Sequence, residues 1–424
     1  LQSEGIESRP ARIFRSATSA LKTSLKAVFN NVLPQSISPA SFSAQVYDSR
    51  VKTETDQLWS AQMRGKEAII GIIDSGLDVL HPDFVDGQGN SRIADYLDFT
   101  GDGIEDDNGH GTHVAGIAGG NGKSSNGEFA GMAPESRFKI AKVFSKSGQS
   151  DESTILAAMK WMRTGEKVDV LNMSLGGPGI PNKDPLGAMA NDLTLRDNIL
   201  VVAAAGNEGP LAGSIGSPAN ARYVFAVGGG DKNGQPVFFS SRGPISDENG
   251  EVLYAKPDLV GISGGVLMPE PQSPDPGNQL AGSAGSEVQI GGLKSLPALP
   301  IQDSCVYAPG VVAARSSRDQ DEFCTVKGNP QYRFFSGTSQ ATPMTAGFAA
   351  NVIGYAKGKN HYATPFHVKA VLMETAVDLG HPQEMQGSGL LSGRRLASAV
   401  LDRVEKGLPL GNIAFSLARR LTSK

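Results

Sequence analysis

Ser339 is the residue of this chain whose surroundings are most typical of a nucleophile. It lies in a Gly-Thr-Ser motif within residues 334–343. A serine hydroxyl attacks a carbonyl carbon only when a base removes its proton and an acid orients that base. Upstream, Asp74 ends an apolar run and His110 opens a glycine-rich stretch, so the chain order is Asp, His, Ser. These residue types predict acyl transfer through an acid, a base and a nucleophile.

The elements that must position these groups alternate along the chain from residue 51 onward. The apolar runs are 68–74, 138–144, 168–175, 199–205 and 223–227, and helical stretches include 153–164 and 186–197. Strands alternating with helices predict a parallel sheet covered on both faces. We therefore expect an α/β fold, a three-layer sandwich with a mostly parallel central sheet. Ligands of such sheets bind beyond the carboxyl ends of the strands, where Asp74 and Asn207 lie.

A metal site is the competing explanation for the two histidines, His110 and His113. No glutamate stands between them, the spacing is not that of His-Glu-x-x-His, and no cysteine or third histidine is nearby. We therefore interpret these residues without a metal.

Six ordered motifs make the chain resemble the subtilisin-like serine proteases. Three are the signatures Asp-Ser-Gly at 74–76, His-Gly-Thr-His-Val-Ala-Gly at 110–116 and Gly-Thr-Ser-x-Ala-Thr-Pro at 337–343, and three further matches are 131–134, 172–178 and 203–209. The resemblance runs from about residue 51 to residue 403 with one insertion, and it is to the bacterial type of catalytic domain.

The resemblance implies a role for each candidate catalytic residue. Asp74 would accept a hydrogen bond from one ring nitrogen of His110, and His110 would take the proton of Ser339 and pass it to the leaving amine. Ser339 would form the acyl-enzyme. Asn207 would donate its side-chain amide to the oxyanion together with the backbone N–H of Ser339. His113 would be structural.

The same resemblance implies how a peptide binds. The residues expected to contact substrate are Ser174, Leu175, Gly176, Gly177, Gly206 and Gly216. The first four would form an edge strand that pairs with an extended peptide, opposite a wall at 144–150. The two glycines Gly206 and Gly216 would leave the primary pocket roomy. We expect broad specificity with a preference for a large apolar residue before the cut, while Glu208 at the rim could admit a basic one.

Small residues crowd the stretches that follow His110 and Ser339. They predict two helices that pack closely against the sheet and against their neighbours. Pro343 is expected near the start of the second helix, where its missing N–H is harmless.

Composition excludes several classes of protein. Glycine accounts for 52 of 424 residues without a fixed period, which indicates tight turns rather than a fibrous repeat. A net charge of -4 and a pI near 5.9 leave no basic face for nucleic acid. No apolar run approaches the roughly 20 residues that cross a bilayer. The expected partners are therefore protein or peptide substrates, with a pro-segment or inhibitor as a further candidate.

Three segments flank or interrupt the expected catalytic domain of residues 51–403. Residues 1–50 combine a basic stretch with apolar residues at helical spacing and a Ser/Pro-rich linker, which predicts a short helix that packs on the domain. The alternatives are a pro-segment remnant or a membrane-surface helix. Residues 404–424 are a tail or the start of a further domain. Because Leu1 is not a start methionine, we expect a processed or excised piece of a longer chain.

An insertion at residues 261–307 is rich in Gly, Pro and Ser and too poor in large apolar residues for its own core. It is interpreted as a surface excursion, with a flap or self-inhibitory segment as the alternative. Cys305 and Cys324, the only cysteines, could close a short loop in an oxidising compartment, or could be two buried thiols. The expected location is secreted or cell-envelope.

No cofactor is required for the expected chemistry, but a structural calcium ion is a further expectation. The acid-rich segment 98–107 could offer oxygen ligands, although such runs are more often solvated turns, and the calcium site is left unidentified. For function, an active serine endopeptidase is favoured over a catalytically silent relative. The reason is that all four residues with an expected catalytic role are present: Asp74, His110, Asn207 and Ser339. An esterase or peptidyl ligase with the same triad is the third alternative.

Overall fold

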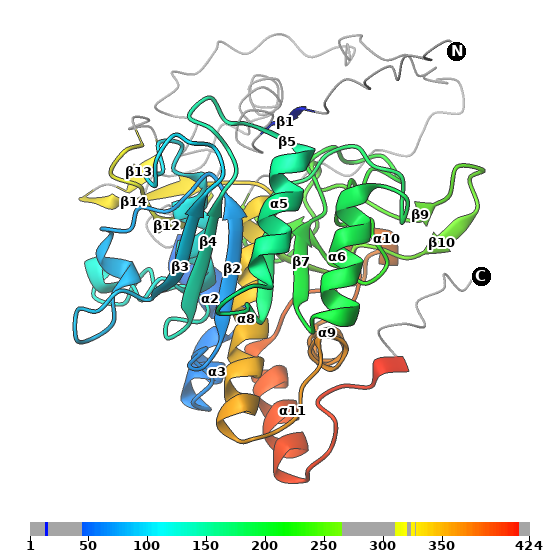
Figure 1. The fold of residues 1–424 in the computed structure, drawn as a ribbon. Coiled ribbons are helices and arrows are strands. Elements are labelled where there is room, and N and C mark those ends of the chain that lie inside the picture. Colours follow the sequence, from blue (N-terminus) through cyan, green and yellow to red (C-terminus); the bar gives the residue numbers. More distant parts are fainter. Residues whose placement is uncertain (1–12, 16–44, 265–309, 320–323, 327, 415–424) are drawn as a thin grey trace, which may run out of the picture.

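A seven-stranded parallel sheet lies at the centre of the structure (Figure 1). The computed structural model describes residues 13–15, 45–264, 310–319, 324–326 and 328–414. In order across the sheet, the strands are β11 (Leu259–Ile262), β8 (Phe225–Gly230), β7 (Leu200–Ala204), β6 (Val170–Met173), β2 (Ile69–Asp74), β4 (Arg137–Lys142) and β3 (Ile93–Asp98). Every neighbouring pair is parallel.

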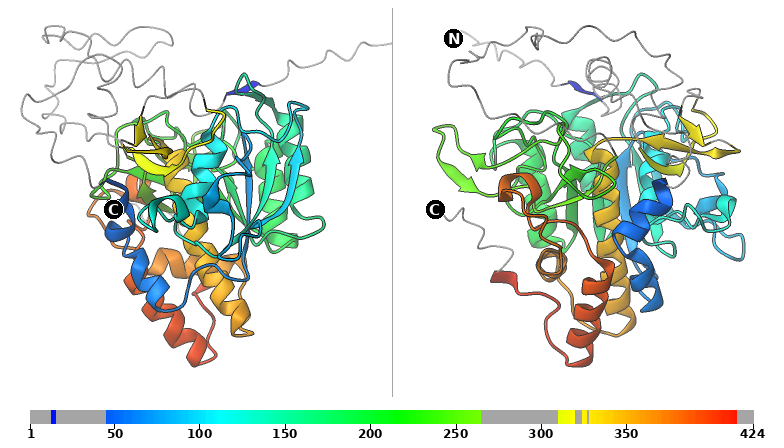
Figure 2. Two further views of the ribbon diagram at one scale, coloured as in Figure 1. Left: turned by 90° about the vertical axis from the view of Figure 1, so that its left-hand side faces the viewer. Right: turned by 180° about the vertical axis from the view of Figure 1, so that it is seen from behind.

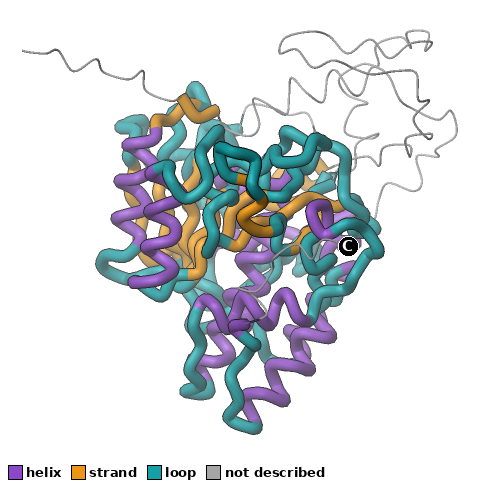
Figure 3. The backbone as a smooth tube through the Cα atoms, turned by 90° about the vertical axis from the view of Figure 1, so that its right-hand side faces the viewer, coloured by secondary structure: helices purple, strands orange, loops and turns teal. Residues whose placement is uncertain are grey.

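Both faces of this sheet are buried, because successive side chains of a strand point to opposite faces. Val170 and Val202 belong to one apolar core, whereas their neighbours Leu171 and Val201 belong to the other. The helices α5 (Glu152–Met162) and α6 (Pro185–Arg196) cover the second face, and α4 (His110–Gly119), α8 (Thr338–Gly358) and α9 (Pro365–Glu374) lie on the first (Figures 2 and 3). The predicted three-layer α/β fold is confirmed.

The five strands and two helices expected from the apolar runs are all present, with ends shifted by a few residues. The two edge strands β3 and β11 were not predicted. β3 carries Asp95 and Asp98 and has no fully buried residue, so its composition lacks the continuous apolar run of a central strand.

Smaller elements surround the sheet. A three-stranded antiparallel sheet consists of β12 (Val311–Ala314), β14 (Asn329–Phe335) and β13 (Thr325–Val326), and two-stranded pairs join β9 (Ile245–Ser246) to β10 (Val252–Tyr254) and β1 (Ile13–Arg15) to β5 (Gln149–Asp151). The remaining helical elements are α2 (Gln45–Lys52), α3 (Thr55–Ser60), η2 (Pro82–Phe84), η3 (Lys123–Ser125), α10 (Gln383–Gln386) and α11 (Gly393–Glu405).

The expected close packing of α4 and α8 is found at their glycines. A Cβ atom on Gly111 would lie 2.1 Å from the carbonyl oxygen of Gly76, directly after β2. A Cβ atom on Gly347 of α8 would lie 2.5 Å from the carbonyl oxygen of Ala118 in α4. Glycine at these two places therefore allows α4 to approach β2 and α8 at backbone distance.

Several segments named in the sequence analysis fall partly outside the described residues. Of the basic stretch 9–32, in which the N-terminal helix was expected, only Ile13–Arg15 is described, and it is the strand β1. The helix α2 spans the expected domain boundary at residue 50. Residues 265–307 of the insertion and 415–424 of the tail lie outside the description. None of the described helices has the length and apolar character needed to span a membrane.

Candidate active site

Asp74 and His110 meet where the central strand β2 ends and the helix α4 begins. The Nδ1 atom of His110 lies 2.7 Å from Oδ1 of Asp74, and both side chains are buried. A carboxylate oxygen only accepts, so Nδ1 carries the hydrogen and Nε2 is left as the basic atom. The same Asp74 oxygen accepts the backbone N–H of Ser75 at 2.7 Å. This pair is the acid–base arrangement expected from the sequence.

A second buried carboxylate, Asp106, holds the start of α4 in place. It accepts hydrogen bonds from the backbone N–H of Gly109 and from both the N–H and the hydroxyl of Thr112. The Ser75 hydroxyl donates to Asp106 and accepts from the N–H of Gly111. The residue that follows Asp74 is thus tied to the residues that flank His110, which fixes the base relative to its acid.

The environment of His110 acts on its pKa in opposing directions. Burial lowers the pKa, whereas the charge of Asp74, its hydrogen bond and the more distant Asp106 raise it. The carboxylates prevail, so the pKa of His110 is raised above its ordinary value. A raised pKa suits an imidazole that must become an imidazolium during the reaction.

Ser339 lies in the first turn of α8, close to the carboxyl end of the sheet. Its hydroxyl donates to the backbone carbonyl of Ser174 at 3.1 Å, and Nε2 of His110 has no hydrogen-bond partner within the described residues. The structure therefore joins Asp74 to His110 by a direct hydrogen bond, while the Ser339 hydroxyl is turned toward the residue after β6.

Pro343 explains a second contact between the same two segments. The prediction that it lies near the start of α8 with a harmless missing N–H is wrong in its reason, because Pro343 is the sixth residue of that helix. A normal residue there would donate to the carbonyl of Ser339, four residues earlier. That carbonyl instead accepts the hydroxyl of Ser174 at 2.8 Å. The proline thus leaves an acceptor by which Ser174 anchors the backbone of Ser339.

Asn207 is oriented by the residue before the nucleophile. Its Oδ1 atom accepts the backbone N–H and the hydroxyl of Thr338, each at 3.0 Å. Because a backbone N–H can only donate, the side-chain atom facing Thr338 must be the oxygen, and the Nδ2 group points elsewhere. Asn207 therefore presents an N–H donor beside the start of α8, where the sequence analysis expects an oxyanion donor.

The predicted substrate segment is only partly paired. Residues 174–177 follow β6, and Gly177 forms an antiparallel β-bridge with Ser217, so pairing of this segment with an extended peptide stays a prediction. A Cβ atom on Gly216 would lie 2.6 Å from the Gly177 carbonyl oxygen, so this close approach requires a glycine. The carboxylate of Glu208 accepts from the Ser241 hydroxyl at 3.0 Å.

The strand β5 overlaps the end of the expected opposite wall and is already paired. β1 adds to it as an antiparallel strand, with Phe14 opposite Ser150. The wall at 144–150 thus has an edge that accepts an extended segment, and the segment belongs to this chain's own N-terminal region.

A buried lysine at the end of β4 contacts the acid-rich segment 98–107. The side chain of Lys142, which is 1% exposed, donates to the Glu105 carbonyl and lies 3.9 Å from the carboxylate of Asp107. Asp98 accepts from Thr100 and Gly103. No group of three or more His, Cys, Asp or Glu residues in the described part of the chain is arranged to hold a metal ion. Calcium stays a prediction without an assigned site.

Of the two cysteines, Cys324 lies within the described residues. Cys324 precedes β13 and is not a free thiol in the described residues. Cys305 lies outside them, so the predicted bridge stays a prediction.

Comparison with known proteins agrees with this geometry. A sequence profile described as the Subtilase family matches residues 65–291 and 297–389, which is most of the chain. The chain belongs to the subtilase family. Its similarity to the serine protease AprX of Bacillus subtilis (strain 168) is 30% identity over 334 residues, covering 73% of this chain and 61% of that protein.

Two further relatives match over shorter stretches. The membrane-bound transcription factor site-1 protease of Homo sapiens is 34% identical over 215 residues, which are 50% of this chain and 19% of that protein. The major intracellular serine protease of Bacillus subtilis (strain 168) is 36% identical over 178 residues, 41% of this chain and 54% of that protein. The chain thus spans less than two thirds of the length of each of these three relatives.

Sequence reasoning missed the supporting roles of several side chains around the site. Asp106 and the hydroxyl groups of Ser75 and Ser174 hold the catalytic backbone, and Arg333 and Phe335 pack behind His110. Single polar residues next to a motif carry no periodic signal. Only the position of Ser75 and Ser174 inside matched motifs could have drawn attention to them.

Proposed function

We propose that this chain is a serine endopeptidase that hydrolyses peptide bonds through an acyl-enzyme. The observation that carries the proposal is the 2.7 Å hydrogen bond between Asp74 and His110, formed at the end of β2. The neighbouring strand β6 leads to Ser174, which bonds to Ser339. Membership of the subtilase family and similarity to serine proteases support the same chemistry.

In the proposed reaction, substrate binding turns the Ser339 hydroxyl from the Ser174 carbonyl toward Nε2 of His110. Catalytic hydrogen bonds often tighten only in the complex with substrate. His110 takes the hydroxyl proton as the oxygen attacks the scissile carbonyl, and Asp74 stabilises the imidazolium. The oxyanion receives the Nδ2 donor of Asn207 and the N–H of Ser339 at the positive end of α8. His110 then protonates the leaving amine. Water hydrolyses the acyl-enzyme, which releases the carboxylic acid product and restores the Ser339 hydroxyl.

The test is labelling with a fluorophosphonate probe, followed by digestion of casein, on wild type and Ser339→Ala. Ser60→Ala, on the exposed side of α3, serves as the matched control. We expect labelling and cleavage by wild type and Ser60→Ala, and neither by Ser339→Ala. An unlabelled wild type would defeat the proposal. Labelling with ester hydrolysis but no peptide cleavage would favour an esterase or ligase.

We propose that the primary pocket prefers a large apolar residue before the cut. The carboxylate of Glu208 is engaged by Ser241, and a Cβ atom on Gly206 would lie 2.3 Å from it, so this acid lies back against the Gly206 backbone. The hydrogen bond from Ser241 uses one acceptor position of this carboxylate, which leaves fewer for a basic side chain of the substrate. A peptide library read by mass spectrometry tests this, and a strict preference for small or acidic residues would contradict it.

We propose that the N-terminal region acts as a built-in competitor for substrate. The support is the pairing of β1 with β5, which uses the wall that an extended substrate would use. A synthetic peptide of residues 9–20, added to the full chain, should slow cleavage competitively, and a scrambled peptide should not. Equal rates with the two peptides would exclude this form of inhibition.

We propose that Cys305 and Cys324 form a disulfide and that the protein works in a secreted or cell-envelope setting. A bridge closing this loop would stabilise the fold by about 3 kcal/mol. Mass measurement with and without reductant, under alkylation, tests the bridge. Alkylation of both cysteines without reductant would contradict it, and the similar intracellular protease shows that the family alone does not fix the compartment.

A further inference from the structure

A buried arginine lies behind the catalytic histidine and has no role in the reaction described above. Arg333, on β14, is 2% exposed and pairs with the carboxylate of Asp319, which is also buried. Arg315, near the same carboxylate, donates to the backbone carbonyl of Asp319 at 2.7 Å. Burial lowers the pKa of Arg333 to about 10, so it keeps its charge at neutral pH. A cation buried this deeply needs strong compensation.

The side chain of Phe335 connects this cation to the histidines. The guanidinium carbon of Arg333 lies 4.0 Å from the centroid of the Phe335 ring. The same ring lies edge-on to His113 at 4.9 Å and is tilted against His110 at 6.2 Å. A cation over an aromatic face is favourable, particularly when it is desolvated. Phe335 is therefore held by Arg333 and forms part of the packing behind His110.

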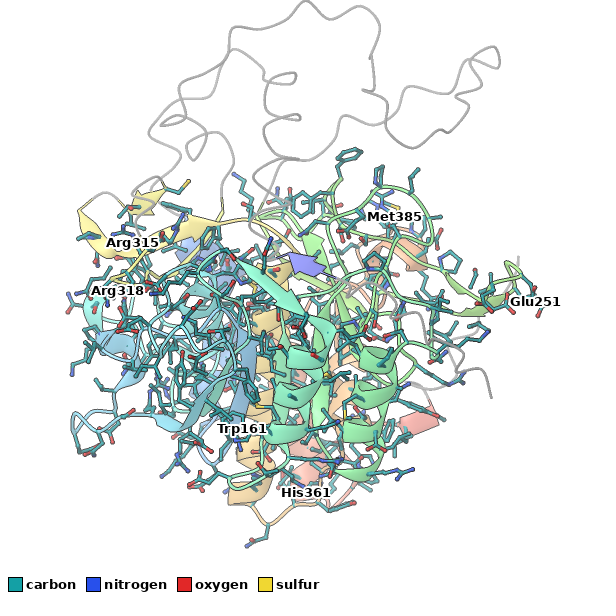
Figure 4. All side chains as sticks on the ribbon, turned by 45° about the horizontal axis from the view of Figure 1, so that its top comes forward. Trp161, Glu251, Arg315, Arg318, His361 and Met385 are labelled. Carbon is teal, nitrogen blue, oxygen red and sulfur yellow. The ribbon has the colours of Figure 1, made fainter. Side chains whose placement is uncertain are left out.

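The backbone on the other side of His110 is tied to the same group. A Cβ atom on Gly109 would lie 2.9 Å from Oδ2 of Asp319, so the residue before His110 rests directly against this carboxylate. The hydroxyl of Ser316 donates to the carbonyl of Asp106 at 2.7 Å. Figure 4 shows that the neighbouring Arg315 and Arg318 lie together at this end of the molecule, near β12 and β14.

We propose that Arg333 is a positioning residue of the triad, which acts with Asp319 and Phe335 to hold the His110 ring and to oppose its protonation. The inference deepens the proposed peptidase function and rests on it. Under this proposal, Arg333 and Asp74 have opposite electrostatic effects on the protonation of His110. Asp74 stabilises the imidazolium that forms in the reaction, whereas Arg333 limits the fraction of enzyme that is already protonated before substrate arrives.

The charged groups that face His110 come from three sides of the described structure. Asp74 is the last residue of β2, Asp106 lies in the loop before α4, and Arg333 lies on β14. The two carboxylates raise the pKa of His110, and Arg333 lowers it together with burial. His113, on the same helix, has its pKa lowered to about 3 and is neutral in the working range. Removing Arg333 should therefore raise the pKa of His110, and removing its counter-charge should lower it.

The experiment uses two variants that should shift the pH profile of kcat/KM in opposite directions. For Arg333→Gln, the acid limb moves to higher pH, and the ratio of kcat/KM at pH 6 to that at pH 8 falls about fivefold, as expected for one charge lost nearby. For Asp319→Asn the ratio rises. Arg333→Lys keeps the charge and should restore most of the wild-type ratio. All values are normalised to active sites titrated with a fluorophosphonate.

A matched control removes another arginine of an ion pair. Arg403→Gln breaks the pair with Glu374 near α11, at the opposite end of the molecule from β14 (Figure 1), and should leave the ratio unchanged. The opposite signs separate an electrostatic role from simple destabilisation, which would lower activity in both variants alike. An unchanged ratio in Arg333→Gln and Asp319→Asn would overturn the inference even if both variants melt earlier.

An activity-independent measurement separates this inference from the proposed function. The His110 resonance in the full chain, assigned by its loss in His110→Gln, is titrated by NMR in wild type and in Arg333→Gln. A wild type that neither labels nor cleaves defeats the peptidase proposal, while the titration still reports on Arg333. The midpoint should move to higher pH in Arg333→Gln, and an unmoved midpoint would overturn the positioning role. If Arg333→Gln does not fold, Asp319→Asn gives the same test with the opposite sign.

Discussion

His110 and His113 lie one turn apart on α4, and both are buried, yet their surroundings shift their pKa values in opposite directions. His110 faces the carboxylate of Asp74, and its pKa is raised. His113 donates its Nε2 hydrogen to the carbonyls of Val311 at 3.0 Å and Arg333 at 3.2 Å, and its pKa is lowered to about 3 by burial and by the charge of Arg333.

The difference shows that burial alone does not decide what a histidine in this helix can do. Both rings lose solvation, which disfavours the charged form. Only His110 receives a carboxylate in return, because it is the residue that meets the end of β2. His113 faces β12 and β14, where carbonyls need a donor. We call the side of α4 that carries His110 its front and the side that carries His113 its back. The front is arranged for proton transfer, and the back for a permanent hydrogen bond.

The largest loss of activity is expected when the front of α4 loses the carboxylate of Asp74. In Asp74→Asn, an amide can present its N–H to Nδ1 and leave the wrong tautomer of His110. We expect kcat to fall by about 10⁴-fold, the loss seen for this change in another triad enzyme. Steady-state cleavage of a peptide substrate measures it. Asp86→Asn, in an exposed turn, is the control, and a loss below tenfold in Asp74→Asn would argue against the assigned acid.

Removing the oxyanion donor should have the next largest effect. Asn207→Ala takes away the Nδ2 donor but leaves the bond between Asp74 and His110. We expect kcat to fall by about 10²- to 10³-fold, a magnitude that comes from subtilisin, a relative of this chain. KM should stay near its wild-type value, because the donor acts in the transition state. A change confined to KM would instead assign Asn207 to substrate binding.

The pH profile sharpens the contrast between the histidines without any mutation. His110 must be neutral to act as a base, and its pKa is raised, so the acid limb of kcat/KM should lie above the ordinary histidine value of about 6.5. Activity should fall about tenfold for each pH unit below that limb. His113→Gln should keep the limb in place. A limb at or below pH 6 in wild type would contradict the dominance of the carboxylates.

Much of the front could be predicted from the sequence, whereas little of the back could. Asp74, His110 and Asn207 lie at strand ends or helix starts inside recognisable motifs. Their types and order were therefore enough to predict that they belong to one site. The strands β12 to β14 carry no such motif, and Arg333 acts through Asp319, fourteen positions earlier, and through packing on Phe335. A contact between an arginine, an aspartate and a phenylalanine produces no repeating pattern in the sequence from which it could be predicted.

The rotamer of Ser339 and the effect of Pro343 were equally beyond sequence reasoning. A motif names the nucleophile but not the carbonyl to which its hydroxyl points. The proline was expected at a harmless position, and the gap that it leaves in the α8 ladder is what allows Ser174 to reach the Ser339 backbone. Such consequences depend on where the helix begins, which sequence patterns locate only to within a few residues.

The smallest expected effect concerns the back of α4. His113→Phe keeps a ring against Phe335 but removes the donor for two buried carbonyls, so the free energy of unfolding should fall by about 1–3 kcal/mol. His113→Gln, which retains an N–H donor, should lose less. Activity per active site at pH 8 should change by less than about threefold, because His113 takes no part in the transition state. Chemical denaturation and active-site titration measure the two quantities.

Acid should then erase part of this difference in stability. The folded pKa of His113 is depressed to about 3, below the unfolded value near 6.5, so the unfolded chain binds a proton that the folded chain excludes. The contribution of His113 to stability is therefore lost as pH falls below about 6.5, whereas that of His110, whose pKa is raised, is lost as pH rises through its folded pKa. The gap between wild type and His113→Phe should shrink from pH 7.5 to pH 5. A constant gap over this range would mean that His113 is not held neutral.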